Sequence, residues 1–92
     1  MRKRREKERY PSLYDAFDLG DRVKRIYKGK NNKKELRGVV LAIDEDGIEI
    51  YWDTIDGKYK PGSMDVAFTN CSIHEIYNGS EKYSRIEKYR GN

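Results

Sequence analysis

The centre of the chain, residues 37–60, carries alternating apolar and polar side chains. Ile48, Ile50 and Trp52 alternate with more polar neighbours, a period of two that is typical of a half-buried strand. An Asp-Gly pair stands on each side of this run, and Asp-Gly suits the tight turns that join antiparallel strands. The apolar run at 39–43 precedes it and favours a strand that is covered on both faces or lies at a barrel corner. Together these features predict a three-stranded antiparallel meander.

The flanking segments extend this sheet. Val23, Arg25 and Tyr27 share one face of a strand while Ile26 lies on the other, and a β-bulge would reconcile the pattern. The polar residues 28–36 contain Gly and Asn and predict a flexible hairpin loop. We therefore expect five strands, near 21–27, 37–44, 47–53, 58–60 and 71–77.

Three short segments favour helical turns or irregular ends. Ser12 is placed to cap a turn through Phe17, with a plain extended lead-in as the alternative. Ser63 is placed to cap a turn over 64–68. Residues 78–92 predict either a marginal helix beginning at Ser80 or a tail.

These patterns predict an all-β fold, a small five-stranded barrel. The chain divides into a basic arm at 1–10, the barrel domain at 11–77 and a short helix or tail at 78–92. The predicted core consists of Val23, Val39, Leu41, Ile43, Ile48, Ile50, Trp52, Val66 and Ile73.

Composition narrows the class of protein. Ninety-two residues make one domain at most, and charged residues at 39% outnumber hydrophobic ones at 36%. Eight Tyr and one Trp supply large buried areas that offset this polarity. No apolar run has the roughly 20 residues of a membrane span, and the charged N-terminus is unlike a signal peptide. One Cys excludes an internal disulfide. We expect a cytoplasmic or nuclear setting with no membrane partner.

The charge is polarised along the chain. Residues 1–10 hold six Arg or Lys and two Glu, and residues 22–37 hold eight Arg or Lys and one Glu. Residues 44–56 instead hold six carboxylates and no base. Such a distribution focuses an electric field that steers an anionic partner to one face.

Two branches of the SH3-like barrels resemble this chain. The run GDRVKRIYKG, followed by RGVV, is similar to the KOW motif of ribosomal proteins and transcription elongation factors. In that motif a Gly-Asp-x-Val strand leads through a basic, Gly-containing loop into Gly-x-Val. The matching residues are Gly20, Asp21, Val23, Gly29, Gly38 and Val39. The resemblance implies an SH3-like barrel of the kind found in nucleoprotein assemblies.

The second branch is the Tudor-like barrel. The segment GVVLAIDEDGIEIYWD looks like its apolar strand, turn and strand ending in aromatic-Asp. Tudor domains that read methylated Lys or Arg use an aromatic cage, for which Tyr27 and Trp52 would supply two walls. Thr54 and Ile55 stand where a further aromatic residue is expected, so we expect no complete cage. The alternative for Trp52 is a place in the core, which its alternation with polar neighbours favours.

The basic loop and arm predict contacts to nucleic acid, either RNA or DNA. Their Lys and Arg side chains would meet phosphates, and Tyr27 would stack on an exposed base. The alternative is a charged hairpin tip that only keeps the domain soluble. The candidate residues are Arg2, Lys3, Arg4, Arg5, Lys24, Arg25, Tyr27, Lys28, Lys30, Lys33, Lys34 and Arg37.

Other reactive residues do not form a catalytic pattern. The carboxylates of residues 44–56 lack the spacing of a calcium loop, so we expect no metal. Cys71 and His74 would point to opposite faces of the predicted strand at 71–77 and are too few for zinc. We therefore expect no enzyme, no cofactor and no small-molecule substrate. The expected function is nucleic-acid binding as an accessory part of a larger nucleoprotein assembly. The alternative is a Tudor-like interaction module that binds a peptide or protein partner.

Overall fold

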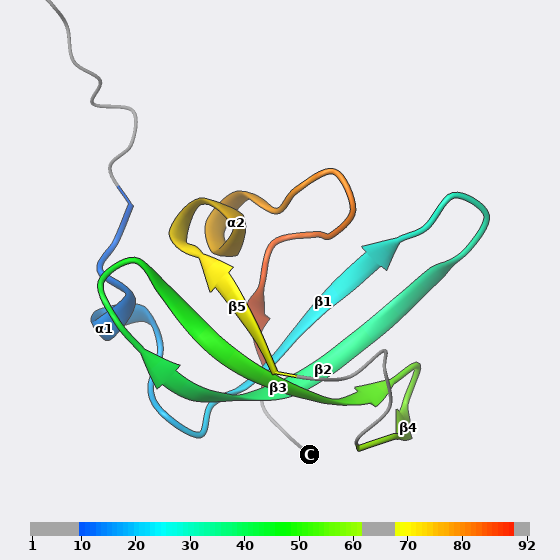
Figure 1. The fold of residues 1–92 in the computed structure, drawn as a ribbon, viewed down its shortest axis with the longest axis horizontal. Coiled ribbons are helices and arrows are strands. Elements are labelled where there is room, and N and C mark those ends of the chain that lie inside the picture. Colours follow the sequence, from blue (N-terminus) through cyan, green and yellow to red (C-terminus); the bar gives the residue numbers. More distant parts are fainter. Residues whose placement is uncertain (1–9, 62–67, 90–92) are drawn as a thin grey trace, which may run out of the picture.

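The alternating run at the centre of the chain forms β3 (Gly47–Ile55), which pairs with three other strands of the computed structural model. The structure describes residues 10–61 and 68–89 (Figure 1). The described part is mostly β-structure, as the sequence predicts. The strands are β1 (Arg22–Lys28), β2 (Lys33–Ile43), β3 (Gly47–Ile55), β4 (Lys58–Tyr59), β5 (Phe68–Ser72) and β6 (Glu87–Lys88), and the helices are α1 (Leu13–Ala16) and α2 (Ile73–Asn78).

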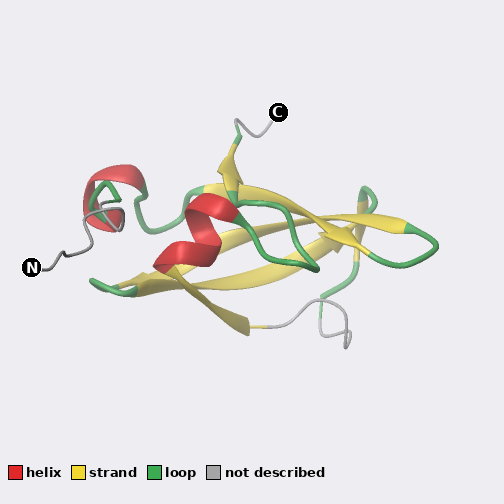
Figure 2. Cartoon of the chain, turned by 90° about the horizontal axis from the view of Figure 1, so that it is seen from above, coloured by secondary structure: helices red, strands yellow, loops and turns green. Residues whose placement is uncertain are grey.

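The strands form one open antiparallel sheet. Its path is β4-β3-β2-β1-β6, and β5 pairs with β3. The first half of β3 carries β5 on the edge away from β2, and its end carries β4 there. α2 lies above the curved sheet in Figure 1 and in front of it in Figure 2. We call the face towards α2 the inner face and the opposite one the outer face.

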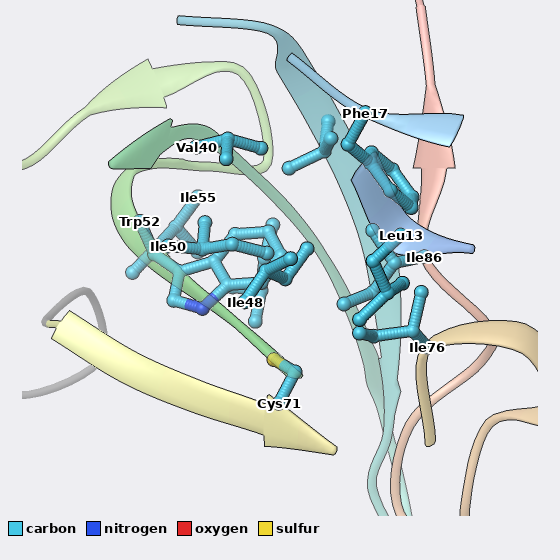
Figure 3. Close-up of a cluster of buried hydrophobic side chains, with 12 residues drawn as sticks. Leu13, Phe17, Val40, Ile48, Ile50, Trp52, Ile55, Cys71, Ile76 and Ile86 are labelled. Atoms are coloured by element: carbon cyan, nitrogen blue, oxygen red, sulfur yellow. The ribbon is translucent and has the colours of Figure 1, made fainter. Parts of the chain in front are cut away.

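The core fills the inner face. Ile48, Ile50 and Trp52 of β3 point inward, and α1 and α2 contribute Leu13 and Ile76 (Figure 3). Ser12 caps α1 by accepting a hydrogen bond from the Tyr14 backbone N–H, so the predicted turn before the first strand is confirmed. The buried apolar side chains are Leu13, Phe17, Val23, Leu36, Val40, Ile48, Ile50, Trp52, Ile55, Cys71, Ile76 and Ile86. No helix of the described residues is long and apolar enough to cross a membrane.

The apolar run of β2 is not covered on both faces, and two predicted core positions shift. The pairing with β3 slips between Val40 and Ala42, so Leu41 is the extra residue of a bulge and is 42% exposed. Val40 takes the buried position instead, whereas Val39 lies half-buried on the outer face. Ile43 returns to the inner side and packs against the core.

β1 carries no bulge, contrary to the prediction. Its pairing with β2 is regular from Arg22 to Lys28. Arg25 therefore faces inward between Val23 and Tyr27 and is only 3% exposed. The regular ladder satisfies the backbone hydrogen bonds, and the interior accommodates the guanidinium against aromatic rings.

The first hairpin has a shorter loop than 28–36. Lys28 pairs with Lys33, so only residues 29–32 turn. The second Asp-Gly turn is as predicted, because Asp56 and Gly57 both have positive φ, 51° and 82°. The first differs: Asp44 accepts hydrogen bonds from the N–H groups of Asp46 and Gly47, and Gly47 begins β3.

The predicted strand at 71–77 is wrong beyond Ser72. Ser72 ends β5 and caps α2, accepting a hydrogen bond from the Glu75 N–H at 3.3 Å. Ser-x-x-Glu is a capping-box sequence, so the helix start was readable from the residues. Gly79 ends the helix with φ 79°. Ile73, predicted in the core, packs against it from α2.

Residues 79–89, the C-terminal segment, contain neither a helix beginning at Ser80 nor a detached tail. The segment runs antiparallel along β1, with a bridge between Tyr27 and Tyr83 and a short pairing of β6 with Val23 and Lys24. Ile86 is buried in the core. Residues 90–92, the turn predicted over 64–68 and Val66 lie outside the described residues, except that Phe68 begins β5.

Candidate nucleic-acid interface

The register of the sheet arranges the outer-face side chains in two rows, because directly opposed residues of antiparallel strands point to the same face. The first row crosses β1, β2, β3 and β5 as Arg22, Val39, Tyr51 and Phe68. The second row crosses β1, β2, β3 and β4 as Lys24, Arg37, Thr54 and Tyr59.

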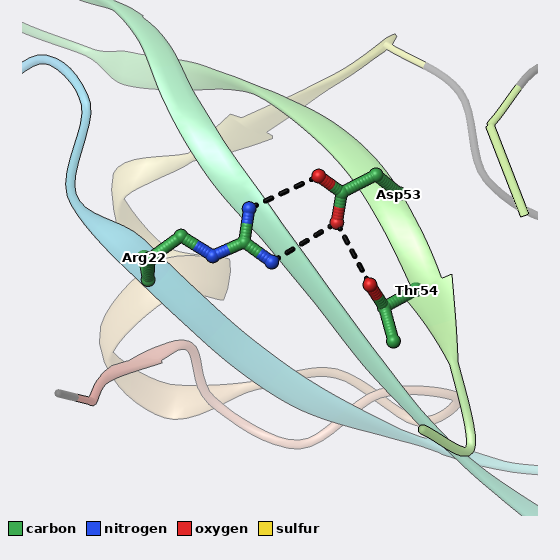
Figure 4. Close-up of polar contacts among 3 residues, drawn as sticks. All are labelled: Arg22, Asp53 and Thr54. Carbon is green, nitrogen blue, oxygen red and sulfur yellow. Dashed lines mark hydrogen bonds and ion pairs between the residues drawn. The ribbon is translucent and has the colours of Figure 1, made fainter. Parts of the chain in front are cut away.

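An ion pair crosses the centre of this face. Arg22 of β1 donates two hydrogen bonds to the Asp53 carboxylate of β3, each 3.0 Å long, above β2 (Figure 4). Asp53 is the extra residue of a second bulge, between Trp52 and Thr54, and this bulge turns its side chain outward. Gly38 makes the bulge possible, because a Cβ there would lie 2.4 Å from the Tyr51 carbonyl oxygen.

The ion pair changes both proton affinities. Partial burial alone raises the pKa of Asp53, but the hydrogen bonds from Arg22 and Thr54 outweigh it and hold the pKa below 3.8. The hydrogen bonds to Asp53 raise the pKa of Arg22 further above its ordinary value. The centre of the outer face is therefore locally neutral at pH 7.

Arg37 is held in a second pair on this face. Its Nη2 lies 3.2 Å from the Glu35 carboxylate, and its guanidinium carbon lies 4.7 Å from the centroid of the Tyr89 ring. The pKa of Arg37 is raised mainly by the hydrogen bond to Glu35. This predicted phosphate ligand lies on the expected surface, but with its charge already balanced by a carboxylate.

Lysines line the outer side of the first hairpin. The register puts Lys24, Lys28 and Lys33 on the outer face, and none of them belongs to an ion pair with the described residues. Lys30 is exposed in the turn. Lys34 lies opposite Tyr27 and so belongs to the inner side of the hairpin.

Two predicted contact residues do not lie on this surface. Arg25 is buried, with its guanidinium carbon 4.2 Å from the centroid of the Tyr83 ring, so it cannot reach a phosphate. Tyr27 faces inward and packs on Tyr83, with ring centroids 5.4 Å apart. The two-residue period of β1 puts Arg25 and Tyr27 on the same face as the buried Val23. The sequence prediction treated them as surface contacts and did not use this period.

The predicted contact residues of the basic arm, Arg2, Lys3, Arg4 and Arg5, fall outside the part of the chain that the structure describes. Tyr10, the last residue of the arm, stacks on Tyr77 of α2 and hydrogen-bonds the His74 ring nitrogen at 2.8 Å. The turn that joins β1 to β2 lies at the other end of the sheet from α1 (Figure 1).

The sequence prediction missed three aromatic residues of the outer face. Phe68 is 60% exposed and packs on Tyr51, with ring centroids 5.1 Å apart. Tyr59 is 70% exposed in the second row. Tyr51 was readable from the sequence as the outward residue between Ile50 and Trp52. Phe68 and Tyr59 come from segments whose pairing with β3 is set only by the fold.

Tyr27 and Trp52 do not form two walls of an open aromatic cage. Trp52 is 3% exposed as a member of the core, and Arg25 lies over its ring at 5.7 Å from the centroid. Tyr27 and Trp52 therefore have no open space between them for a methylated side chain of another protein. The core interpretation of Trp52 is confirmed.

The carboxylates of residues 44–56 are dispersed in the fold. Asp44 holds its own turn, Asp53 pairs with Arg22, and Asp56 accepts a hydrogen bond from the Glu35 N–H. Within residues 10–61 and 68–89, no three His, Cys, Asp or Glu side chains come together as a metal site.

Cys71 and His74 are separated by the start of α2. Cys71 lies in the core, and burial raises the pKa of its thiol, although nearby Arg25 acts in the opposite direction. His74 is exposed on α2, next to Tyr10 and Asn78. The predicted arrangement on opposite faces of one strand is thus replaced by one buried thiol and one surface imidazole.

Comparisons with known proteins identify no relative of this chain. No protein-family model, no curated protein and no solved structure matches this chain.

Proposed function

We propose that this protein binds nucleic acid through the outer face of the β1–β2 hairpin. The observation that carries the proposal is the alignment of Lys24, Lys28 and Lys33 on one side of one hairpin. Lys24 and Lys28 lie four residues apart on β1, roughly 13 Å at about 3.3 Å per residue, and Lys33 lies directly opposite Lys28 on β2. Such a row suits a phosphate backbone and carries no sequence information by itself.

The ion pairs of the same face support the proposal. Asp53 and Glu35 would repel phosphates, but Arg22 and Arg37 neutralise them at 3.0 Å and 3.2 Å. The remaining charge of the hairpin is therefore positive, whereas the exposed carboxylates Asp44, Glu45 and Asp46 lie in the turn that leads into β3. This separation favours the hairpin as the contact surface for an anion.

We further propose that the chain is an SH3-like barrel of the KOW type. The meander β1–β2–β3 carries the motif residues in structural positions: the Gly20 N–H donates to the Val40 carbonyl, and Gly38 allows the close approach to Tyr51. We take the protein to act as an accessory part of a larger nucleoprotein assembly. Recovery of RNA or DNA with the protein from cell lysate, lost after nuclease treatment, checks this role.

The test is a salt-dependent binding measurement. Fluorescence anisotropy with labelled single strands and duplexes of RNA and DNA gives the affinity of the parent and of Lys28→Ser/Lys33→Ser. Each phosphate contact contributes about 0.7–0.9 to the slope of log affinity against log salt. We expect the double variant to bind every probe more weakly and to show a slope that is flatter by about 1.4–1.8.

A charge-matched variant makes the result specific. Lys58→Ser/Lys88→Ser removes the same charge, and the register puts these lysines opposite the inward residues Ile55 and Val23. This control should bind nearly as the parent does. Equal loss in both double variants, or no binding by the parent, would overturn the proposal. Binding of a peptide or protein partner with no nucleic acid would favour an interaction module instead.

A further inference from the structure

Exposed aromatic rings occupy the outer face on the side away from the lysines. Phe68 on β5 and Tyr59 on β4 flank the end of β3, and Tyr51 on β3 supports Phe68 from beside it. Phe68 and Tyr59 are 60% and 70% exposed. Exposed apolar rings gathered on one face mark a surface that another molecule covers.

The charges around these rings indicate the chemistry of that molecule. Along the first row, Val39 of β2 lies between Arg22 of β1 and the Tyr51–Phe68 pair, and neighbouring strands are about 4.8 Å apart. On this surface the rings and Lys24 lie within about three strand spacings, roughly 15 Å, across the strands, whereas Lys28 and Lys33 lie four residues, roughly 13 Å, further along the hairpin. A ligand that fits it combines negative charge with flat apolar groups.

We propose that this surface binds single-stranded nucleic acid, whose bases stack on the Phe68–Tyr51 pair and on Tyr59. The inference rests on the proposed function and deepens it. In a duplex the faces of the bases are covered by their neighbours, so only unpaired bases can lie flat on an aromatic ring. Lys24, Lys28 and Lys33 meet phosphates of the same nucleic-acid strand. A positively charged groove combined with aromatic rings is the general physical solution for single strands.

The first experiment removes one ring at a time. Phe68→Ala and Tyr59→Ala are compared with the parent by fluorescence anisotropy, with labelled 12-nucleotide oligouridine and oligothymidine and with a duplex of the same length. We expect each variant to bind the single strands at least about fivefold more weakly, which is about 1 kcal/mol at 1.4 kcal/mol per tenfold. The salt slope and the duplex affinity stay as in the parent, because stacking releases few counterions.

A matched control and a rescue separate stacking from loss of folding. Tyr14→Ala removes a ring that is 54% exposed on α1, away from the outer face, and should bind as the parent does. Phe68→Tyr keeps an aromatic ring and should retain binding. A 2-aminopurine placed in the oligonucleotide should lose fluorescence on binding the parent and lose less on binding Phe68→Ala.

The outcomes distinguish this inference from the proposed function. If Lys28→Ser/Lys33→Ser weakens binding while both alanine variants bind single strands as the parent does, the stacking inference is wrong and the lysine contact stands. If the alanine variants weaken duplex and single-strand binding equally, the preference for unpaired bases is wrong. If sedimentation instead shows a dimer of the parent that Phe68→Ala dissociates, the rings bind a second copy, which also overturns the inference.

Discussion

Arg25 is a charged residue buried in the interior. Its guanidinium lies near the rings of Tyr83 and Trp52, and its Nη1 donates to the Cys71 sulfur over 3.7 Å. Its Nε and Nη2 atoms are buried and have no hydrogen-bond partner among the described residues. A buried cation of this kind loses hydration that stacking on aromatic rings only partly replaces.

We expect Arg25→Met to leave the free energy of unfolding within about 1 kcal/mol of the parent, because Met keeps the apolar stem and removes the unpaired charge. Arg25→Ala should cost about 2–4 kcal/mol, because it also removes that packing. Urea unfolding measures both changes. Nucleic-acid affinity should be the same in parent and Arg25→Met; a loss of affinity in the folded Met variant would contradict the buried position of Arg25.

At the scale of elements, the bulge in β3 and the hairpin depend on each other. The bulge turns Asp53 outward, and the carboxylate then joins β3 to Arg22 of β1 across β2. Thr54 Oγ1 donates to the same carboxylate at 3.0 Å. The ion pair therefore joins β1 to β3 on the outer face, and the hydrophobic core joins the same strands on the inner face.

Asp53→Asn tests how much the Arg22–Asp53 ion pair contributes to stability. The parent's Asp53 has a lowered pKa, so its contribution to stability is fully present above 3.8, the ordinary value, and is lost as the pH falls through the lower folded value. At pH 7 we expect Asp53→Asn to lower the free energy of unfolding by about 1 kcal/mol, the upper end for a partly exposed pair. As the pH falls below the lowered folded-state pKa of Asp53, the two proteins should converge in stability.

Glu45→Gln is the control for this measurement, since Glu45 is exposed in the turn between β2 and β3. Its stability should match that of the parent across the pH range in chemical denaturation. A constant difference between the parent and Asp53→Asn at all pH values would show that shape rather than charge matters at this position.

For the whole molecule, the C-terminal segment completes the fold. Its Tyr83 ring covers Arg25, and its Ile86 side chain joins the core. Its strand β6 pairs with β1 on the edge away from β2. The Ile86 N–H donates to the Ile76 carbonyl, which ties this segment to α2. The segment therefore connects the helix over the inner face to one edge of the sheet.

Ile86→Ala should lower the free energy of unfolding by about 2–4 kcal/mol, because the side chain is 5% exposed and its removal leaves a cavity. Thermal or urea unfolding measures the loss. Leu19→Ala, at a side chain that is 66% exposed, should change stability by less than about 0.5 kcal/mol. Equal stability of parent and Ile86→Ala would mean that the segment is not part of the folded unit.

Local patterns alone were sufficient where one periodicity or one turn dominates. The alternation of Ile48, Ile50 and Trp52 predicted the inward face of β3, and the Asp56-Gly57 pair predicted a turn with positive φ at both residues. Ser12 predicted the start of α1. In each case the decisive interactions lie within a few residues of the chain, so the sequence determines them.

Contacts between distant segments decided the rest. The bulges at Leu41 and Asp53 arise from the fit of two strands, and no single strand specifies them. Phe68 and Tyr59 share the outer face with the lysines only because β5 and β4 pair with β3. Tyr83 and Ile86 look like residues of a polar tail until the open edge of β1 and the buried guanidinium give them partners. Burial and edge pairing depend on the whole chain, and they outweigh the weak local preferences of these segments.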